Sequence, residues 1–280
     1  MDATEKVKKP GLSAWGAFLV VLFIILMEII LYLPLETILG MVETFIDEVT
    51  MTYFRLGEEI IASGVVVYIL YRRVRRKSLE HIKLPTETAW KHIAFATLLI
   101  TGYVFFPGNA IHYLLKDIEV SEFLMEAIDE LAQSNVVLFL SLIIVAPIYE
   151  EVVYRWIIQD GLAKRYNIVF SIIFSSLLFS LMHMNIHQSV NTFFLGMVLG
   201  FIYWKSGSLL AAVFAHALNN LYALTVLDYV FFEDQMNWPL FIIGAVLFIT
   251  AVIFYVKIKK PEIEENMDIL EVCLIEAAEE

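Results

Sequence analysis

The chain has 280 residues, of which 60% are hydrophobic and 18% are charged, and its formal net charge is -12. Soluble globular proteins carry about 25% charged residues, so this composition excludes an ordinary soluble domain and indicates an integral membrane protein. No stretch forms a domain-sized basic face, which leaves nucleic-acid binding without support. The single cysteine, Cys273, excludes an intramolecular disulfide and a cysteine-rich metal site.

About eight apolar runs of membrane-spanning length follow one another along the chain. A spanning helix needs about 17–25 predominantly apolar residues. The second run is the weakest, because Arg55, Glu58 and Glu59 near its start also fit an amphipathic segment followed by a shorter span. The sequence therefore predicts an all-α, polytopic membrane helix bundle with about eight transmembrane helices. The expected spans are Ala14–Leu35, Met51–Tyr71, Ala89–Leu115, Val136–Leu162, Asn167–His183, Ser189–Trp204, Ser208–Leu227 and Trp238–Val256.

The basic residues predict the orientation of these spans. Lys and Arg gather in cytoplasmic loops of membrane proteins. With the N-terminus inside, all of the 19 basic residues except Arg55, Lys116 and Arg155 fall in inner segments. A multi-pass topology with both termini cytoplasmic follows. In the outer loop from Asp117 to Gln133, apolar residues recur at helical spacing, which predicts an amphipathic helix at the membrane interface.

Three charged residues interrupt the fourth apolar run. A charged side chain at the centre of a membrane helix costs about 2.5–3.5 kcal/mol even on lenient scales, so Glu150, Glu151 and Arg155 must face protein or water. Glu151 and Arg155 are four residues apart and can pair on one helix face. Glu150 is rotated by about 100° from that face. We therefore expect a structural Glu151–Arg155 pair and a Glu150 carboxylate that is free for chemistry.

Two later runs also contain polar side chains, and His216 and Asn220 share one helix face because they are four residues apart. Taken singly, such residues usually join helices. Together with the glutamates and His183 they supply the parts of a hydrolytic site. A carboxylate in an apolar setting can take a proton from water, and a histidine beside it can orient that water. A second histidine and an amide can donate to the oxyanion of a tetrahedral intermediate.

These residues form three motifs that resemble the CPBP family, which contains type II CAAX prenyl endopeptidases and bacteriocin-processing relatives. The motifs are Glu150-Glu151-x-x-x-Arg155, Phe179-x-x-x-His183 and His216-x-x-x-Asn220, in the family's order, and Gly207-Ser208-Leu209 before the third is also similar. The resemblance implies an intramembrane glutamate protease without a cofactor. It also implies that Glu150 and His183 activate water, while His216 and Asn220 stabilise the oxyanion.

The implied substrate is a peptide or protein at the lipid bilayer, either prenylated and of the CAAX type or a small peptide. Two alternatives remain open. The first is a zinc-dependent membrane protease with Glu150, His183 and His216 as ligands, since two histidines and one carboxylate can hold zinc. The second is a non-catalytic immunity or transport protein of the same fold.

The chain shows no internal repeat and no low-complexity linker, so residues 1–280 are expected to form a single membrane domain. Within it, residues 1–135 hold accessory spans and loops, and residues 136–227 form the catalytic core in spans four to seven. Residues 228–260 contain the last span. Residues 261–280 form an acidic cytoplasmic tail.

Overall fold

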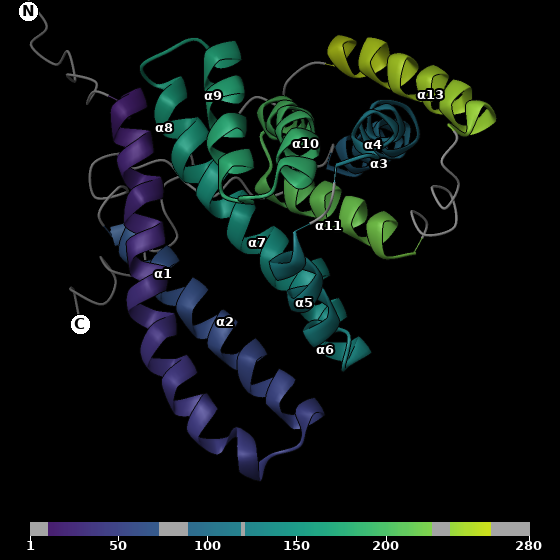
Figure 1. The fold of residues 1–280 in the computed structure, drawn as a ribbon. Helices are drawn as coiled ribbons and strands as arrows, with labels where there is room; N and C mark the ends of the chain where they lie inside the picture. Colours follow the sequence, from purple (N-terminus) through teal and green to yellow (C-terminus); the bar gives the residue numbers. More distant parts are fainter. Residues whose placement is uncertain (1–10, 73–88, 119–120, 226–235, 259–280) are drawn as a thin grey trace, which may run out of the picture.

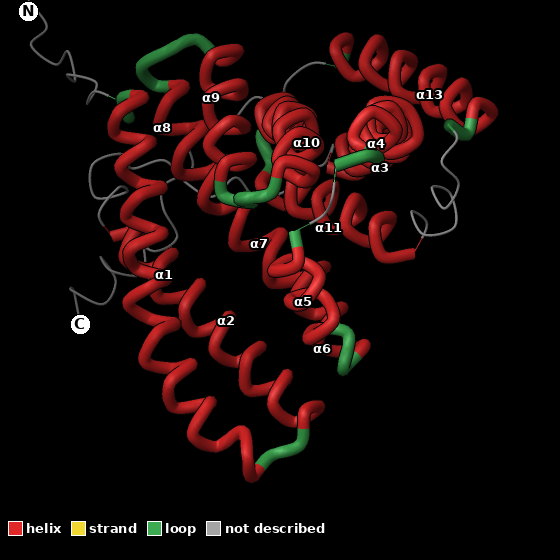
Figure 2. Tube along the Cα trace, viewed as in Figure 1, coloured by secondary structure: helices red, strands yellow, loops and turns green. Residues whose placement is uncertain are grey.

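The computed structural model describes residues 11–72, 89–118, 121–225 and 236–258, and within these ranges the chain is helical and contains no strand (Figures 1 and 2). The predicted all-α class is confirmed. The N-terminal ten residues and the acidic tail lie outside the described residues. The cytoplasmic location of both termini therefore stays a prediction.

Five α-helices lie within the described residues of the first half of the chain. A 3-10 turn follows the first of them, and a π-helical stretch at Val104–Gly108 joins the third to the fourth. The helices are α1 (Ala14–Val42), α2 (Glu48–Leu70), α3 (Ala89–Tyr103), α4 (Asn109–Leu115) and α5 (Glu122–Leu131). Helix α5 lies in the predicted outer-loop helix, although its location at a membrane interface stays a prediction.

The described residues of the second half form one long helical segment with two π-helical stretches, followed by four further helices. The long segment comprises α6 (Asn135–Phe139), the π-stretch Leu140–Val145, α7 (Ala146–Glu151), the π-stretch Val152–Gln159 and α8 (Asp160–Ala163). The further helices are α9 (Ile168–Leu181), α10 (Ile186–Ser206), α11 (Leu209–Thr225) and α13 (Trp238–Lys257).

Four of the described helical segments are long and apolar enough to cross a membrane, which identifies an integral membrane protein. They are Ala14–Phe45, Trp90–Leu115, Asn135–Ala163 and Trp238–Lys257, and Ile168–Leu181 and Leu209–Thr225 are shorter apolar helices. Each predicted run is helical where it is described, but the count of eight membrane spans stays a prediction.

The second predicted run lies in one continuous helix, α2, which is not among the four segments above, so the alternative of an amphipathic segment followed by a shorter span stays open. Asp47 caps its start by accepting hydrogen bonds from the backbone N–H and the hydroxyl of Thr50. These bonds hold the pKa of the Asp47 carboxyl below its ordinary value. Because an N-cap satisfies the first amides of a helix, α2 begins directly after the short turn from α1.

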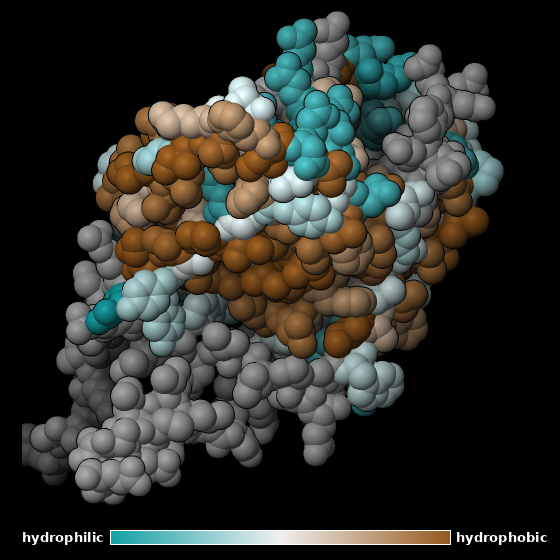
Figure 3. Space-filling model, turned by 90° about the horizontal axis from the view of Figure 1, so that it is seen from below, coloured by the Kyte–Doolittle hydropathy of each residue, from teal (hydrophilic) through white to brown (hydrophobic). Residues whose placement is uncertain are grey.

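A small apolar cluster of Tyr203, Leu209 and Ala212 accompanies two larger apolar cores in the described residues. One is formed by α1, α2 and α9 around the π-stretch Val152–Gln159, and the other by α3, α10, α11 and α13. Large apolar side chains also cover the outer surface, for example Ile30, Leu33 and Ile243. Figure 3 shows this as a broad hydrophobic band across one face. The outward apolar surface fits a lipid environment, and the polar site described below lies between the cores.

Helices α3 and α13 approach so closely that only glycine fits at two positions. A Cβ atom on Gly102 would lie 2.5 Å from the backbone nitrogen of Phe248, and one on Gly244 would lie 2.7 Å from the carbonyl carbon of Phe105. Small residues at such crossings allow backbones to pack in membranes. Helix α10 packs closely at Gly196 and Gly200, where an added Cβ would lie 3.0 Å from Ser176 Cβ and 2.6 Å from Gln159 Oε1.

We expect Gly102→Ala to destabilise the folded protein by about 1–3 kcal/mol, the usual cost of overpacking. Backbone atoms of α13 would have to move, because no flexible side chain can give way. Gly64→Ala in α2 is the matched control, since nothing lies within 4 Å of its added Cβ. Thermal unfolding in detergent measures both. Equal melting temperatures for Gly102→Ala and wild type would contradict the packing described here.

Candidate active site

The segment that carries the two glutamates is distorted around Pro147. The backbone N–H of Ala146 donates to the carbonyl of Ser141, five residues earlier, as in a π-helix. Pro147 itself has no N–H to donate. Single π-helical turns inside α-helices are frequent at functional sites. Here π-helical stretches flank α7 on both sides, and α7 ends at Glu151.

Glu151 and Arg155 form the predicted ion pair. Arg155 Nε lies 2.9 Å from Glu151 Oε2, and both side chains are fully buried. The Arg155 guanidinium also lies 5.2 Å from the centre of the Phe179 ring, where the ring's negative face attracts a cation. The prediction from helix spacing is confirmed. Sequence spacing did not reveal the second partner of Arg155, the aromatic ring.

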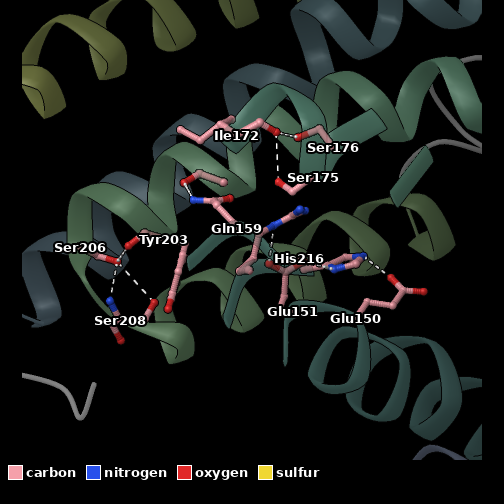
Figure 4. A network of polar contacts seen from close by, with 12 residues as sticks. Glu150, Glu151, Gln159, Ile172, Ser175, Ser176, Tyr203, Ser206, Ser208 and His216 are labelled. Atoms are coloured by element: carbon pink, nitrogen blue, oxygen red, sulfur yellow. Dashed lines mark hydrogen bonds and ion pairs between the residues drawn. The ribbon is translucent and has the colours of Figure 1, made fainter. Parts of the chain in front are cut away.

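His216 joins the two glutamates (Figure 4). Its Nδ1 lies 2.9 Å from Glu151 Oε1, and its Nε2 lies 3.5 Å from Glu150 Oε2. Because Glu151 also faces the Arg155 guanidinium, we assign it as the ionised carboxylate, which can only accept hydrogen bonds. His216 Nδ1 therefore donates to Glu151, and Nε2 is directed at Glu150. The imidazole is 3% exposed.

Glu150 is the accessible member of this group, with 24% of its side chain exposed against none for Glu151. The expectation that Glu150 has no partner on its own helix is correct. Its partner comes from another helix, since the His216 imidazole approaches it from α11, and its availability for chemistry stays a prediction. Helix geometry within the Glu150 segment could not reveal a neighbour from a different helix.

His183 lies just after the end of α9, in the turn that follows Leu181. Its Nδ1 is 3.1 Å from the carbonyl oxygen of Phe179, and its ring meets the Phe179 ring edge to face at 5.0 Å between centres. The same Phe179 ring packs 5.8 Å from His216. Phe179 therefore lies between the two motif histidines, and no hydrogen bond joins His183 to Glu150.

Asn220 shares the site-facing side of α11 with His216, as predicted. Its Nδ2 donates to the backbone carbonyl of Leu142 at 2.8 Å, and its Oδ1 accepts from Asn219 at 3.3 Å. One N–H of the amide is thus engaged by the chain itself.

The tight turn into α11 depends on Gly207, whose φ of 63° is a left-handed conformation that glycine adopts without strain.

The zinc-dependent alternative requires three metal-binding side chains that lie close together. Within the described residues, no group of three or more His, Cys, Asp or Glu side chains is arranged to hold a metal ion. The alternative zinc set of Glu150, His183 and His216 is therefore not assembled in this structure.

Two further carboxylates approach the site from α1 and α2. Tyr149 donates a hydrogen bond to Glu28 at 2.9 Å, and Ser141 donates one to Glu59 at 2.7 Å. Both glutamates lie within electrostatic range of Glu150. The sequence signal for them was present, since each is a charged residue inside an apolar run, but their contact with the Glu150 segment was not foreseeable.

His92 was also missed, because no ionisable residue lies three or four positions from it in the sequence. It is buried and its Nδ1 lies 3.1 Å from the hydroxyl of Tyr255, on a different helix. Nearby, Lys205 donates to the carbonyl of Val256 at 2.9 Å. These contacts tie α3 and α10 to the end of α13 and lie in the second apolar core rather than beside the glutamates.

Comparison with protein families returns one match. Residues 132–222 match the family model "Type II CAAX prenyl endopeptidase Rce1-like". Comparisons with curated proteins and with solved structures give no match. The matched segment contains all three motifs and the helices that carry Glu150, His183, His216 and Asn220. Over residues 132–222, about a third of its length, the chain is therefore similar to the Rce1-like proteases of the CPBP family.

Proposed function

We propose that this protein is an intramembrane endopeptidase that hydrolyses a peptide bond of a membrane-associated substrate through activated water. The observation that carries the proposal is the buried His216 imidazole between Glu150 and Glu151. A histidine oriented by one carboxylate and directed at a second group is a recurrent arrangement in hydrolytic enzymes. The similarity of residues 132–222 to a protease family supports the same reaction class.

In the proposed reaction, Glu150 is the general base. It takes a proton from water while the water oxygen bonds to the scissile carbonyl carbon. Glu150 then gives that proton to the leaving nitrogen as the carbon–nitrogen bond breaks, which yields a carboxylic acid and an amine. His183 assists by orienting the water. Its Nδ1 faces a backbone carbonyl, which only accepts, so its Nε2 is the atom that can accept from water.

The proposed oxyanion donors are His216 and Asn220. If both nitrogens of His216 are protonated, the imidazolium and Arg155 together balance the charges of Glu150 and Glu151. A neutral set suits a buried site, since an unbalanced charge there is costly. The hydrogen bond donated by His216 Nε2–H can then change its acceptor from Glu150 to the developing oxyanion. Asn220 retains one N–H beyond its bond to Leu142, and each such donor is worth about 10²–10³-fold in rate.

The proposed substrate is a prenylated CAAX-type protein or a small peptide, and the proposed topology has about eight spans with both termini cytoplasmic. The activity test uses the full chain reconstituted in liposomes with a farnesylated CAAX peptide and with the same peptide lacking the lipid. We expect cleavage of the farnesylated form. Cleavage of the unlipidated peptide alone would favour the small-peptide class. Cleavage of neither, in folded protein, would support the non-catalytic alternative.

We expect the cleavage rate to be unchanged by metal chelators, because the proposed steps use only protein side chains and water. The measurement compares turnover before and after treatment with 1,10-phenanthroline, together with elemental analysis of the purified protein. A matched zinc protease treated in parallel controls for effective chelation. Stoichiometric zinc in the active protein, with activity lost on chelation and restored by zinc, would establish the zinc-dependent alternative instead.

A further inference from the structure

The carbonyl of Leu142 loses both of its usual helical donors, for a reason that is visible in the sequence. In a π-helix this carbonyl would accept from the N–H of residue 147, five positions later, and residue 147 is proline. In an α-helix it would accept from Ala146, but the Ala146 N–H donates to Ser141. A backbone carbonyl in a membrane helix needs a partner, since leaving it unsatisfied costs several kcal/mol.

Asn220 supplies that partner from α11. A carbonyl oxygen can only accept, so the atom of the Asn220 amide that faces Leu142 at 2.8 Å must be its nitrogen. The amide oxygen is turned the other way and accepts from Asn219. Both ends of the amide are thus engaged, which defines its orientation without any substrate.

The Asn220 contact has a counterpart on the other side of Pro147. One turn earlier on α11, His216 contacts Glu150 and Glu151. Helix α11 therefore contacts the segment that carries the two glutamates at two points. One is Leu142, before the proline, and the other is the glutamate pair after it. The stretch between them contains the distortion that determines where the two carboxylates lie relative to the His216 ring.

We propose that Asn220 is a positioning residue that replaces the hydrogen bond lost at Pro147 and thereby holds Glu150 and Glu151 against His216. This inference rests on the proposed function only for its effect on turnover. We call the hydrogen bond from Asn220 Nδ2 to the Leu142 carbonyl the latch. The latch also stabilises the folded protein, independently of turnover. The Asn220 amide makes this hydrogen bond before substrate binds. The bond also orients the remaining N–H of the amide.

The test is a double-mutant cycle between Asn220→Ala and Pro147→Ala. Alanine at position 147 restores an N–H that can satisfy the Leu142 carbonyl, so it makes the latch redundant. In the wild-type background we expect Asn220→Ala to lower kcat by about 10²-fold, as small misplacements in an active site do, with KM nearly unchanged. In the Pro147→Ala background the loss should be clearly smaller. Residues within one hydrogen-bond network show such coupling.

The outcomes separate three roles. An equal kcat loss in both backgrounds would overturn the proposal and leave Asn220 as an oxyanion donor alone. A fall in melting temperature with no change in kcat would overturn the positioning role. If wild type cleaves none of the substrates, the proposed function fails, whereas the latch is still tested by coupling in melting temperature. Absence of coupling in both kcat and melting temperature would exclude it.

A second variant keeps the test decisive if Pro147→Ala does not fold. Asn220→Asp preserves the side-chain size but turns an acceptor toward the Leu142 carbonyl. The latch predicts that Asn220→Asp melts at a lower temperature than Asn220→Ala, because two acceptors then face each other. Equal melting temperatures would contradict the latch. Asn219→Ala, which removes only the contact to the amide oxygen, serves as the neighbouring control.

Discussion

Glu150→Gln is expected to abolish cleavage while the protein still folds. The amide keeps the size of the side chain and its place near His216, but it cannot take a proton from water. Loss of a general base typically lowers turnover by about 10²–10⁴-fold. Because Glu150 is partly exposed and lies outside the buried Glu151–Arg155 pair, its neutralisation leaves that pair intact.

Turnover of the farnesylated peptide in liposomes measures this effect, and thermal unfolding in detergent checks the fold. Glu126→Gln on the exposed surface of α5 is the matched control and should retain wild-type turnover. A Glu150→Gln variant as active as wild type would remove Glu150 from the mechanism. Loss of activity together with loss of folding would instead assign Glu150 a structural role.

Glu151→Gln and Arg155→Ala are expected to destabilise the folded protein by about 3–5 kcal/mol each, because each leaves the other member of a fully buried ion pair without its partner. Glu151→Gln should also reduce activity, since Glu151 orients His216 through Nδ1. The two effects have different origins and can be measured separately. Thermal unfolding in detergent reports the first, and kcat at a temperature where the variant is folded reports the second.

The double variant Glu151→Gln with Arg155→Met provides the control for this argument. Replacing both members of a buried pair removes both charges and is often close to neutral for stability. We therefore expect the double variant to be more stable than Arg155→Ala. If the single variants melt like wild type but are inactive, the pair is catalytic rather than structural, and the assignment of Glu151 and Arg155 as supporting residues is wrong.

Local geometry explains which contacts of the site were predictable. Glu151 and Arg155 pair because residues four apart share a helix face, whatever the rest of the fold does. The same rule put His216 and Asn220 on one side of α11. The approach of His216 to Glu151 joins residues 65 positions apart, and it depends on how α11 is rotated and how deeply it sits beside α7. Spacing within one helix does not contain that information.

The sequence by itself determined that this is a helical membrane protein with three motifs in the order of a protease family. Composition decides the first, because so many apolar residues cannot all be buried inside a chain of this size. Only the tertiary structure decided that His216 lies between the two glutamates, that Phe179 separates the motif histidines, and that Asn220 bonds to Leu142. Each of these contacts depends on the rotation and depth of packed helices, which follow from the packing of the whole bundle.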